Sequence, residues 1–241
     1  MSLLLTLYVP EGIIIAGDSR LTLNWSSQLG ADITTHSITA SDSNNKVFVL
    51  KDKFGLGVFG AADVNGIPIS GFINQFIEEK INDNTEIDQI PMLLHDFFGE
   101  RFNMPKINFY TAGYKFENGI SVQHVYHLDI HNAITTRVNV PNNKIDYGAN
   151  WGGEVEVLLR IIQNIKIFRN GNWVDLPAIP IPWNFFTLQD AIDFALYAIR
   201  TTIETMRFQQ KEKTVGGPID ILAIKPNEKP VWIKKKIYKA E

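Results

Sequence analysis

The sequence predicts an α+β protein in which one sheet packs against another and helices cover the outside. Apolar runs of strand length come in consecutive groups, whereas segments with apolar residues at helical spacing come in pairs. The chain has 241 residues, of which 45% are hydrophobic. A chain of this length and composition can bury a substantial core.

The chain opens with a tight hairpin of two buried strands. The apolar runs at 3–9 and 13–16 are separated by only three residues, which include Pro10 and Gly12. Asp18 and Arg20 follow the second run at once. An acid and a base at the end of a buried strand have to pair, cap a turn or serve a site, because an unpaired charge there is costly.

The next segment, near 21–45, is polar and rich in Ser, Thr and Asn, which predicts a long excursion or an irregular hairpin. Two strands are then expected at 47–50 and 55–59, joined by a charged turn. Lys46 stands directly before the first of them.

The remaining elements follow from the same two periodicities. We expect helices at 64–81 and 90–102, strands at 107–113, 120–131, 135–140 and 145–147, helices at 154–167 and 188–208, and strands at 219–224 and 231–237. No linker divides the chain, so a single domain over 1–241 is expected. The three lysines from Lys234 to Lys236 are typical of the charged protection of an edge strand.

An aromatic and proline-rich insertion near 168–186 separates the last two expected helices. It includes Trp173 and Trp183, and its prolines disfavour a helix. Two interpretations stay open: the insertion folds back over its own core, or it forms a contact between copies in an oligomer.

Three blocks of the sequence, in order, are similar to the N-terminal nucleophile hydrolases of the proteasome type. The first is GIIIAGDSR, from Gly12 to Arg20, which matches the family's A/G-x-D-x-R signature. The second is Lys46 followed by a small-residue turn, Gly60 to Asp63. The third runs from 190 to 224 and resembles the family's last long helix, glycine pair and closing strand. The resemblance implies a four-layer αββα sandwich of two mainly antiparallel sheets with helices outside.

A hydroxyl becomes a good nucleophile when a nearby base takes its proton, and the α-amine of the same residue can be that base. Ser2 would qualify once Met1 is removed, and it falls where the family carries its N-terminal threonine. The resemblance implies that Lys46 lowers the pKa of the hydroxyl and the amine, and that Asp18 holds Lys46.

The resemblance also implies further site residues. The backbone N–H of Gly60 would be the oxyanion donor, Arg20 completes the signature with Asp18, and Glu212 stands one methylene longer where the family has an aspartate. The chain departs from the family at Val215 and Ala149, which stand where active members carry serines. We expect a peptidase or amidohydrolase with some catalytic positions altered.

Other readings compete with this one. A vector-derived start would make Ser2 foreign to the native chain; Lys46 could be a gatekeeping charge, and Asp18 with Arg20 a structural pair. The rival function is a non-catalytic proteasome-like assembly or scaffold subunit, and a third is a ligand-binding protein that keeps the cleft.

Composition restricts partners. The net charge of −3 gives no basic field for nucleic acid, and the N-terminal apolar run is too short for a membrane span. No cysteine is present, which fits a reducing compartment, and we expect a cytoplasmic protein.

His127 and His131 share a strand face but lie about 13 Å apart, too far for one metal, so neither a metal nor a cofactor is expected. The expected partners are a peptide or amide substrate and further copies of the chain in a ring-like assembly; the sequence does not identify an ATPase regulator.

Overall fold

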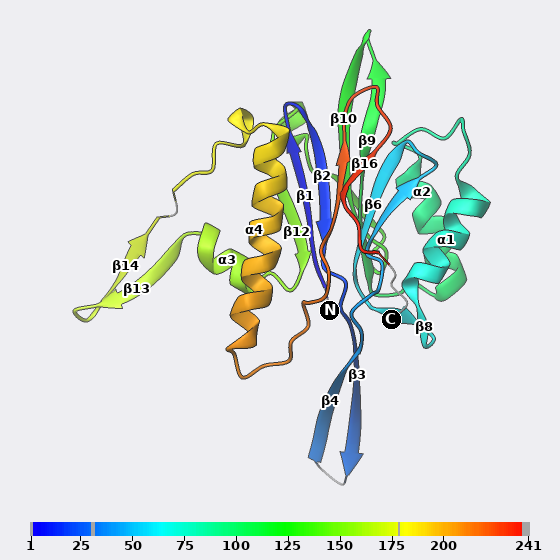
Figure 1. The fold of residues 1–241 in the computed structure, drawn as a ribbon. Helices are drawn as coiled ribbons and strands as arrows, with labels where there is room; N and C mark the ends of the chain where they lie inside the picture. Colours follow the sequence, from blue (N-terminus) through cyan, green and yellow to red (C-terminus); the bar gives the residue numbers. More distant parts are fainter. Residues whose placement is uncertain (1, 30–31, 178, 238–241) are drawn as a thin grey trace.

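The structure is a computed structural model that describes residues 2–29, 32–177 and 179–237. Two five-stranded antiparallel sheets lie at its centre (Figure 1). The first sheet has the order β12-β1-β2-β15-β16, with strands β1 (Leu3–Val9), β2 (Gly12–Gly17), β12 (Gly148–Gly153), β15 (Asp220–Ile224) and β16 (Val231–Lys234). The second has the order β11-β10-β9-β6-β5, with strands β5 (Val47–Leu50), β6 (Phe54–Gly60), β9 (Ile107–Glu117), β10 (Ile120–Asp129) and β11 (Ile134–Arg137).

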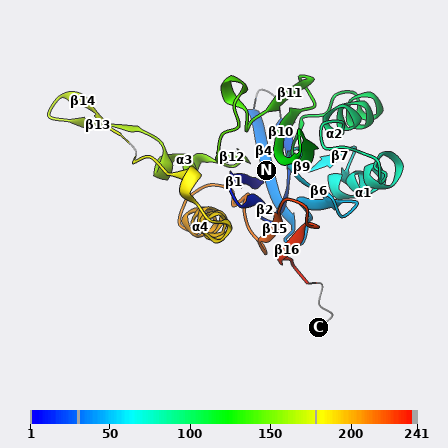
Figure 2. The ribbon, with the colours of Figure 1, turned by 90° about the horizontal axis from the view of Figure 1, so that it is seen from above.

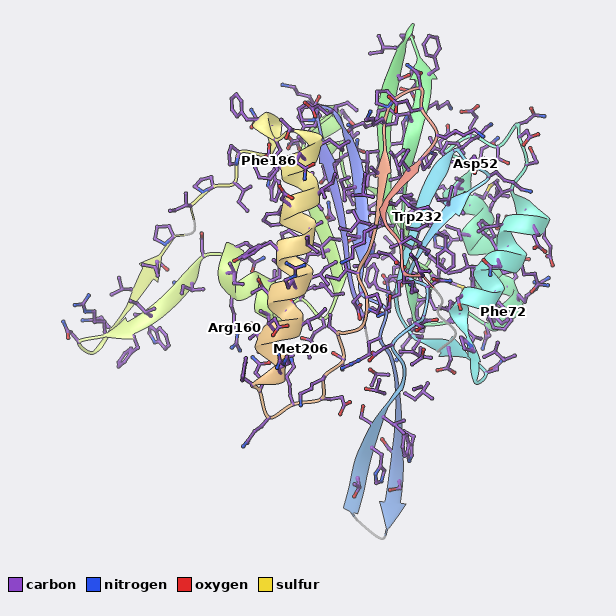
Figure 3. All side chains as sticks on the ribbon, viewed as in Figure 1. Asp52, Phe72, Arg160, Phe186, Met206 and Trp232 are labelled. Atoms are coloured by element: carbon purple, nitrogen blue, oxygen red, sulfur yellow. The ribbon has the colours of Figure 1, made fainter. Side chains whose placement is uncertain are left out.

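The described helices lie on the outer faces of the two sheets (Figures 1 and 2). They are α1 (Ile69–Lys80), α2 (Ile90–Leu94), which continues as the π-helical turn η1 (His95–Glu100), α3 (Glu156–Ile162) and α4 (Leu188–Arg207), with short 3-10 turns η2 (Pro141–Asn143) and η3 (Trp183–Phe185). Phe72 on α1 and Met206 on α4 mark the two opposite flanks (Figure 3).

Three apolar clusters hold these parts together, and strand β1 shows how. Its alternate residues Leu3, Leu5 and Leu7 pack toward α4, while Leu4 and Tyr8 belong to the cluster between the sheets. The third cluster joins the second sheet to α1 and α2. Because β1 is buried on both faces, its sequence is a continuous apolar run rather than an alternating one.

Two-stranded ribbons extend from this body. Strands β3 (Leu21–Leu29) and β4 (Asp32–Ser41) form one of them, so the polar segment near 21–45 is largely a long β-hairpin. Strands β13 (Ile165–Arg169) and β14 (Asn172–Leu176) form a second, and both project well away from the sheets (Figure 1). A third, small ribbon consists of β7 (Asp63–Val64) and β8 (Ile67–Pro68).

Several expected elements were wrong or displaced. The strand expected at 145–147 is not formed, and the sheet uses the glycine-rich Gly148–Gly153 instead. A Cβ on Gly152 would collide with the ring of Phe59, so this strand needs glycine for close packing rather than β-branched residues.

The helix expected at 154–167 ends at Ile162, because the residues from Ile165 onward pair with β14. Asn170 and Gly171 both have positive φ and form the turn between these strands. The helix expected at 64–81 begins only at Ile69, after Pro68, and the second half of the one expected at 90–102 is a π-helical turn.

The two parts of the insertion near 168–186 differ in where they lie. Trp183 packs against Phe186 and Phe194 at the cluster under α4, so this part folds back over the chain's own core. Trp173 lies on the projecting ribbon and is 69% exposed.

Candidate functional site

Asp18, directly after β2, is the centre of a buried polar cluster. One carboxylate oxygen, Oδ1, accepts hydrogen bonds from the backbone N–H of Leu3 at 2.9 Å and from Lys46 Nζ at 2.7 Å. The other, Oδ2, accepts from the backbone N–H groups of Arg20 and Gly216 at 3.1 and 3.0 Å. Both oxygens of this buried carboxylate therefore have hydrogen-bond partners. Asp18 therefore joins the start of β1, the end of β2, the strand after Lys46 and the loop before β15.

Lys46 is brought to Asp18 by the second sheet. Its carbonyl accepts a hydrogen bond from the N–H of Val58 at 2.9 Å, so it continues the β5–β6 pairing, and its side chain is 3% exposed. Burial lowers the pKa of Lys46 below the ordinary lysine value; Asp18 opposes this, and the positive charges of Lys236 and Arg20 add to it. The expected ion pair of Asp18 and Lys46 is present, and it bridges the two sheets.

Ser2 lies beside this pair and is 6% exposed. Its carbonyl oxygen accepts a hydrogen bond from the N–H of Glu154 at 2.6 Å, and the next peptide N–H, that of Leu3, is bonded to Asp18. Gly153 has φ +93°, and a Cβ there would collide with the Ser2 carbonyl. Only glycine fits at this position, which fixes Ser2 against the end of β12.

Two polar residues at this end of the site escaped the sequence reasoning. Glu154 is 9% exposed and accepts a hydrogen bond from Lys211 Nζ at 3.0 Å and a longer one from the Thr214 hydroxyl at 3.4 Å. Thr214 is 1% exposed. Thr214 directly precedes Val215, the position at which the sequence lacks the family's serine, and this neighbouring hydroxyl is the signal that could have identified it. Glu154 follows Gly153 at the end of β12, and only the pairing of β1 with β12 shows that its N–H reaches the Ser2 carbonyl.

The register also corrects the position assigned to Ala149. Strands β1 and β12 run antiparallel with Leu3 opposite Gly153 and Leu7 opposite Ala149. Ala149 is therefore four residues along the strand from the N-terminal end and does not mark a missing hydroxyl at Ser2. Val215 is 1% exposed and belongs to the apolar cluster under α4, so its side chain serves packing.

Arg20 braces the site from outside. Its guanidinium forms a bidentate pair with Asp42, at 2.6 and 2.8 Å, and donates to the carbonyl of Lys213 at 3.1 Å. A Cβ on Gly216 would lie 2.5 Å from the Arg20 guanidinium carbon, so the glycine lets Arg20 lie flat on this loop. The pKa of Asp42 is lowered, chiefly by the hydrogen bonds from Arg20.

Of the two remaining predicted site residues, Gly60 lies at the end of a central strand, whereas Glu212 lies at the surface. Gly60 ends β6, two residues after Val58, and has φ +101°. A Cβ there would lie 2.7 Å from the carbonyl oxygen of Lys106, so the backbone conformation requires glycine. Glu212 is exposed, and its charge acts on Arg20 rather than on Lys46.

No group of three or more metal-ligating side chains is found among the residues that the structure describes. Within those same residues, no helix combines the length and apolarity needed to cross a bilayer.

Comparisons with known proteins give the fold. No protein-family profile matches the sequence, and no curated protein is similar to it. Among solved structures, the chain is similar to Anbu from Hyphomicrobium sp. strain MC1, with a TM-score of 0.56 and 12% sequence identity over 96% of this chain and 87% of the other. Anbu is a proteasome-like N-terminal nucleophile hydrolase. At this identity the likeness concerns the fold, and it confirms that the chain has the proteasome-like fold that the three sequence blocks predicted.

Proposed function

We propose that this protein is an N-terminal nucleophile hydrolase that cleaves amide bonds of peptides or related small substrates, with Ser2 as the nucleophile after removal of Met1. The observation that carries the proposal is the shared Asp18 oxygen, which binds both the Leu3 amide and the Lys46 ammonium. A buried ion pair is thereby held one peptide unit from Ser2. The four-layer αββα arrangement belongs to the proposal and is supported by the three apolar clusters.

In the first step, the freed α-amine of Ser2 takes the hydroxyl proton, and Oγ attacks the substrate carbonyl carbon. The carbonyl electron pair moves to the oxygen, and the N–H of Gly60 stabilises the oxyanion. Lys46 favours this step because its positive charge stabilises the developing alkoxide. When the tetrahedral intermediate collapses, the carbon–nitrogen bond breaks and the leaving amine receives the proton from the Ser2 ammonium.

In the second step, water attacks the ester on Ser2 while the α-amine takes one of its protons. Collapse releases a carboxylic acid and restores the hydroxyl, so the products are an acid and an amine. Glu154 binds the Ser2 carbonyl through its N–H and accepts a hydrogen bond from the Thr214 hydroxyl, and we assign these two residues to orienting the N-terminal residue. Glu212 keeps the more distant role of supporting the charge of Arg20.

A non-catalytic scaffold subunit is the second candidate, and the burial of the site favours it. Ser2 is 6% and Lys46 3% exposed, so a substrate needs local opening at the N-terminus to reach them. In this case the Asp18–Lys46 pair only ties the two sheets together. Both candidates include a cytoplasmic location and self-association of the chain.

The test begins with mass spectrometry of the untagged protein expressed from its native start. The enzyme requires that Met1 is absent, and that a β-lactone or an epoxyketone adds one equivalent of mass to the N-terminal peptide. Ser2→Ala is the matched control and removes the adduct while leaving Asp18 and Lys46 in place. A processed Ser2 terminus that forms no adduct after prolonged exposure decides for the scaffold.

A further inference from the structure

Lys235 and Lys236, just after β16, contact residues beside the candidate site, although the sequence pattern assigned both lysines to the protection of an edge strand. Strand β16 is indeed at an edge, and Lys234 is exposed. Lys236 behaves differently, because its side chain is only 4% exposed. A buried lysine needs partners, and those partners are informative.

Asp220, the first residue of β15, receives the lysines. It is 1% exposed and accepts a hydrogen bond from the backbone N–H of Lys236 at 2.7 Å. The ammonium groups of Lys236 and Lys235 both pair with its other oxygen, the latter at 3.3 Å. Trp232, on β16 (Figure 3), carries Lys235 over its ring at 4.1 Å.

Each lysine also reaches a residue next to one member of the Asp18–Lys46 pair. Lys236 Nζ donates to the Ser19 hydroxyl at 2.9 Å, and Lys235 Nζ donates to Asn45 Oδ1 at 3.4 Å. Ser19 follows Asp18, and Asn45 precedes Lys46.

Ser19 is held by hydrogen bonds from its backbone and its side chain. It is fully buried, its N–H donates to the carbonyl of Gly216 at 3.0 Å, and its carbonyl accepts from the N–H of Asn44 at 3.0 Å. The hydroxyl bonded to Lys236 is the third contact. The turn that carries Asp18 is therefore held on three sides, one of them by the C-terminal segment.

We propose that Lys236, with Lys235 beside it, is a positioning residue of the Asp18–Lys46 site, acting through Ser19 and Asn45 as a clamp supplied by the C-terminal segment. The clamp rests on the proposed function of that pair. Lys236 also places a second positive charge near Lys46, where the other charged groups are Asp18 and Arg20. A neighbouring ammonium lowers the pKa of Lys46, as burial does, while the ion pair with Asp18 opposes this and favours the charged form.

The test is an NMR titration of the ε-carbon signal of Lys46, assigned by its loss in Lys46→Arg. We expect Lys236→Met to raise the midpoint of this titration by about one pH unit, because a like charge is removed. Lys236→Arg keeps the charge and the donors and should restore the wild-type midpoint. Lys234→Met, in the exposed neighbour, is the matched control and should leave it unchanged.

The second measurement is hydrogen exchange at the amides of Leu3 and Gly216, both of which Asp18 accepts. It should become about tenfold faster in Lys236→Met, the equivalent of one hydrogen bond to a charged group. If that variant fails to fold, Lys236→Met combined with Asp220→Asn leaves no unpaired carboxylate and takes its place in the exchange measurement. Unchanged exchange in a folded variant, or an unchanged Lys46 midpoint in folded Lys236→Met, overturns the clamp.

Neither measurement uses hydrolysis. If Ser2 forms no adduct but the Lys46 midpoint moves, the clamp stands and the proposed enzyme fails. If Ser2 forms its adduct and the midpoint and the exchange rates do not move, the enzyme stands and the clamp fails.

Discussion

Asp18 concentrates more of the site's interactions than any other described residue of the cluster, because its two oxygens accept four hydrogen bonds from four separate parts of the chain. Its partner Lys46 is almost fully buried. Such a pair affects the free energy of unfolding mainly when one of its two charged side chains is replaced. The remaining charge then stays buried without its counter-ion, although the backbone donors remain.

We therefore expect Lys46→Met to lower the free energy of unfolding by about 3–5 kcal/mol, in addition to abolishing any hydrolysis. Combining it with Asp18→Asn removes the unpaired charge and should recover part of this loss. Urea denaturation of the three proteins measures the difference. Equal stabilities of wild type and Lys46→Met would mean that the pair is solvated and that the packing described for it is wrong.

His127 predicts a second effect at the scale of single residues. It stacks on Phe59 and lies near Tyr110, at ring distances of 5.9 and 5.1 Å, and burial lowers its pKa below 6.5. The unfolded chain therefore binds a proton more readily than the folded one just below pH 6.5. The stability linked to His127 is present above that pH and is lost as the pH falls through the lowered pKa.

The expected result is that His127→Phe, which keeps the stack, reduces the fall in thermal midpoint between about pH 7.5 and about pH 5.5. His131→Gln, at an exposed position just beyond the same strand, is the control and should fall as the wild type does. An equal fall in all three proteins would assign the acid sensitivity to other groups. Scanning calorimetry gives the midpoints.

At the scale of elements, sequence reasoning worked where one periodicity dominated. The continuous apolar run of β1 and the helical spacing of α4 each predicted their element to within a residue or two. Strand β12 was missed because it has no apolar pattern to read: its sequence is GANWGG, and its glycines exist to let Tyr8 and Phe59 approach. The position of this strand depends on close contacts with residues far away in the sequence, and no local sequence pattern reveals them.

The β13–β14 ribbon was missed for another reason. The apolar residues of 154–167 fit helical spacing in the first part of the segment and strand alternation in the last part. The dipeptide Asn170-Gly171 was the signal for a hairpin turn after the second part. In the site, the order of the sequence motifs was enough to predict the ion pair of Asp18 and Lys46. The contributions of Glu154 and Lys236 could be found only from the strand register and from the path of the chain after β16. The proposed roles of Ser2, Gly60, Arg20 and Glu212 remain predictions.

The ribbon also bears on self-association. Every residue of β13 and β14 is exposed, including the tilted aromatic pair of Phe168 and Trp173 near the tip. An isolated two-stranded hairpin is marginally stable in water, so a ribbon that projects this far gains from packing against another surface. We assign that surface to a second copy of the chain.

At the scale of the whole molecule, we expect light scattering to give a mass above the 27.3 kDa of one chain at micromolar concentration. Phe168→Ser with Trp173→Ser should shift the mass toward one chain. Phe116→Ser with Ile120→Ser, at the equally exposed tip of the β9–β10 hairpin, is the matched control and should leave the mass unchanged. A wild-type protein of 27.3 kDa would contradict the assignment.

The bonds from Gly216 to Asp18 and from Lys236 to Ser19 have a consequence for the order of events during synthesis. The ribosome makes the first strands long before it makes these partners, and segments near the N-terminus begin to fold first. Asp18 and Ser19 must wait for partners that follow them by 198 and 217 positions in the sequence. A product that terminated before Gly216 would lack both bonds, so the arrangement around Asp18 and Ser19 is completed only after the segment from Gly216 to Lys236 has been made.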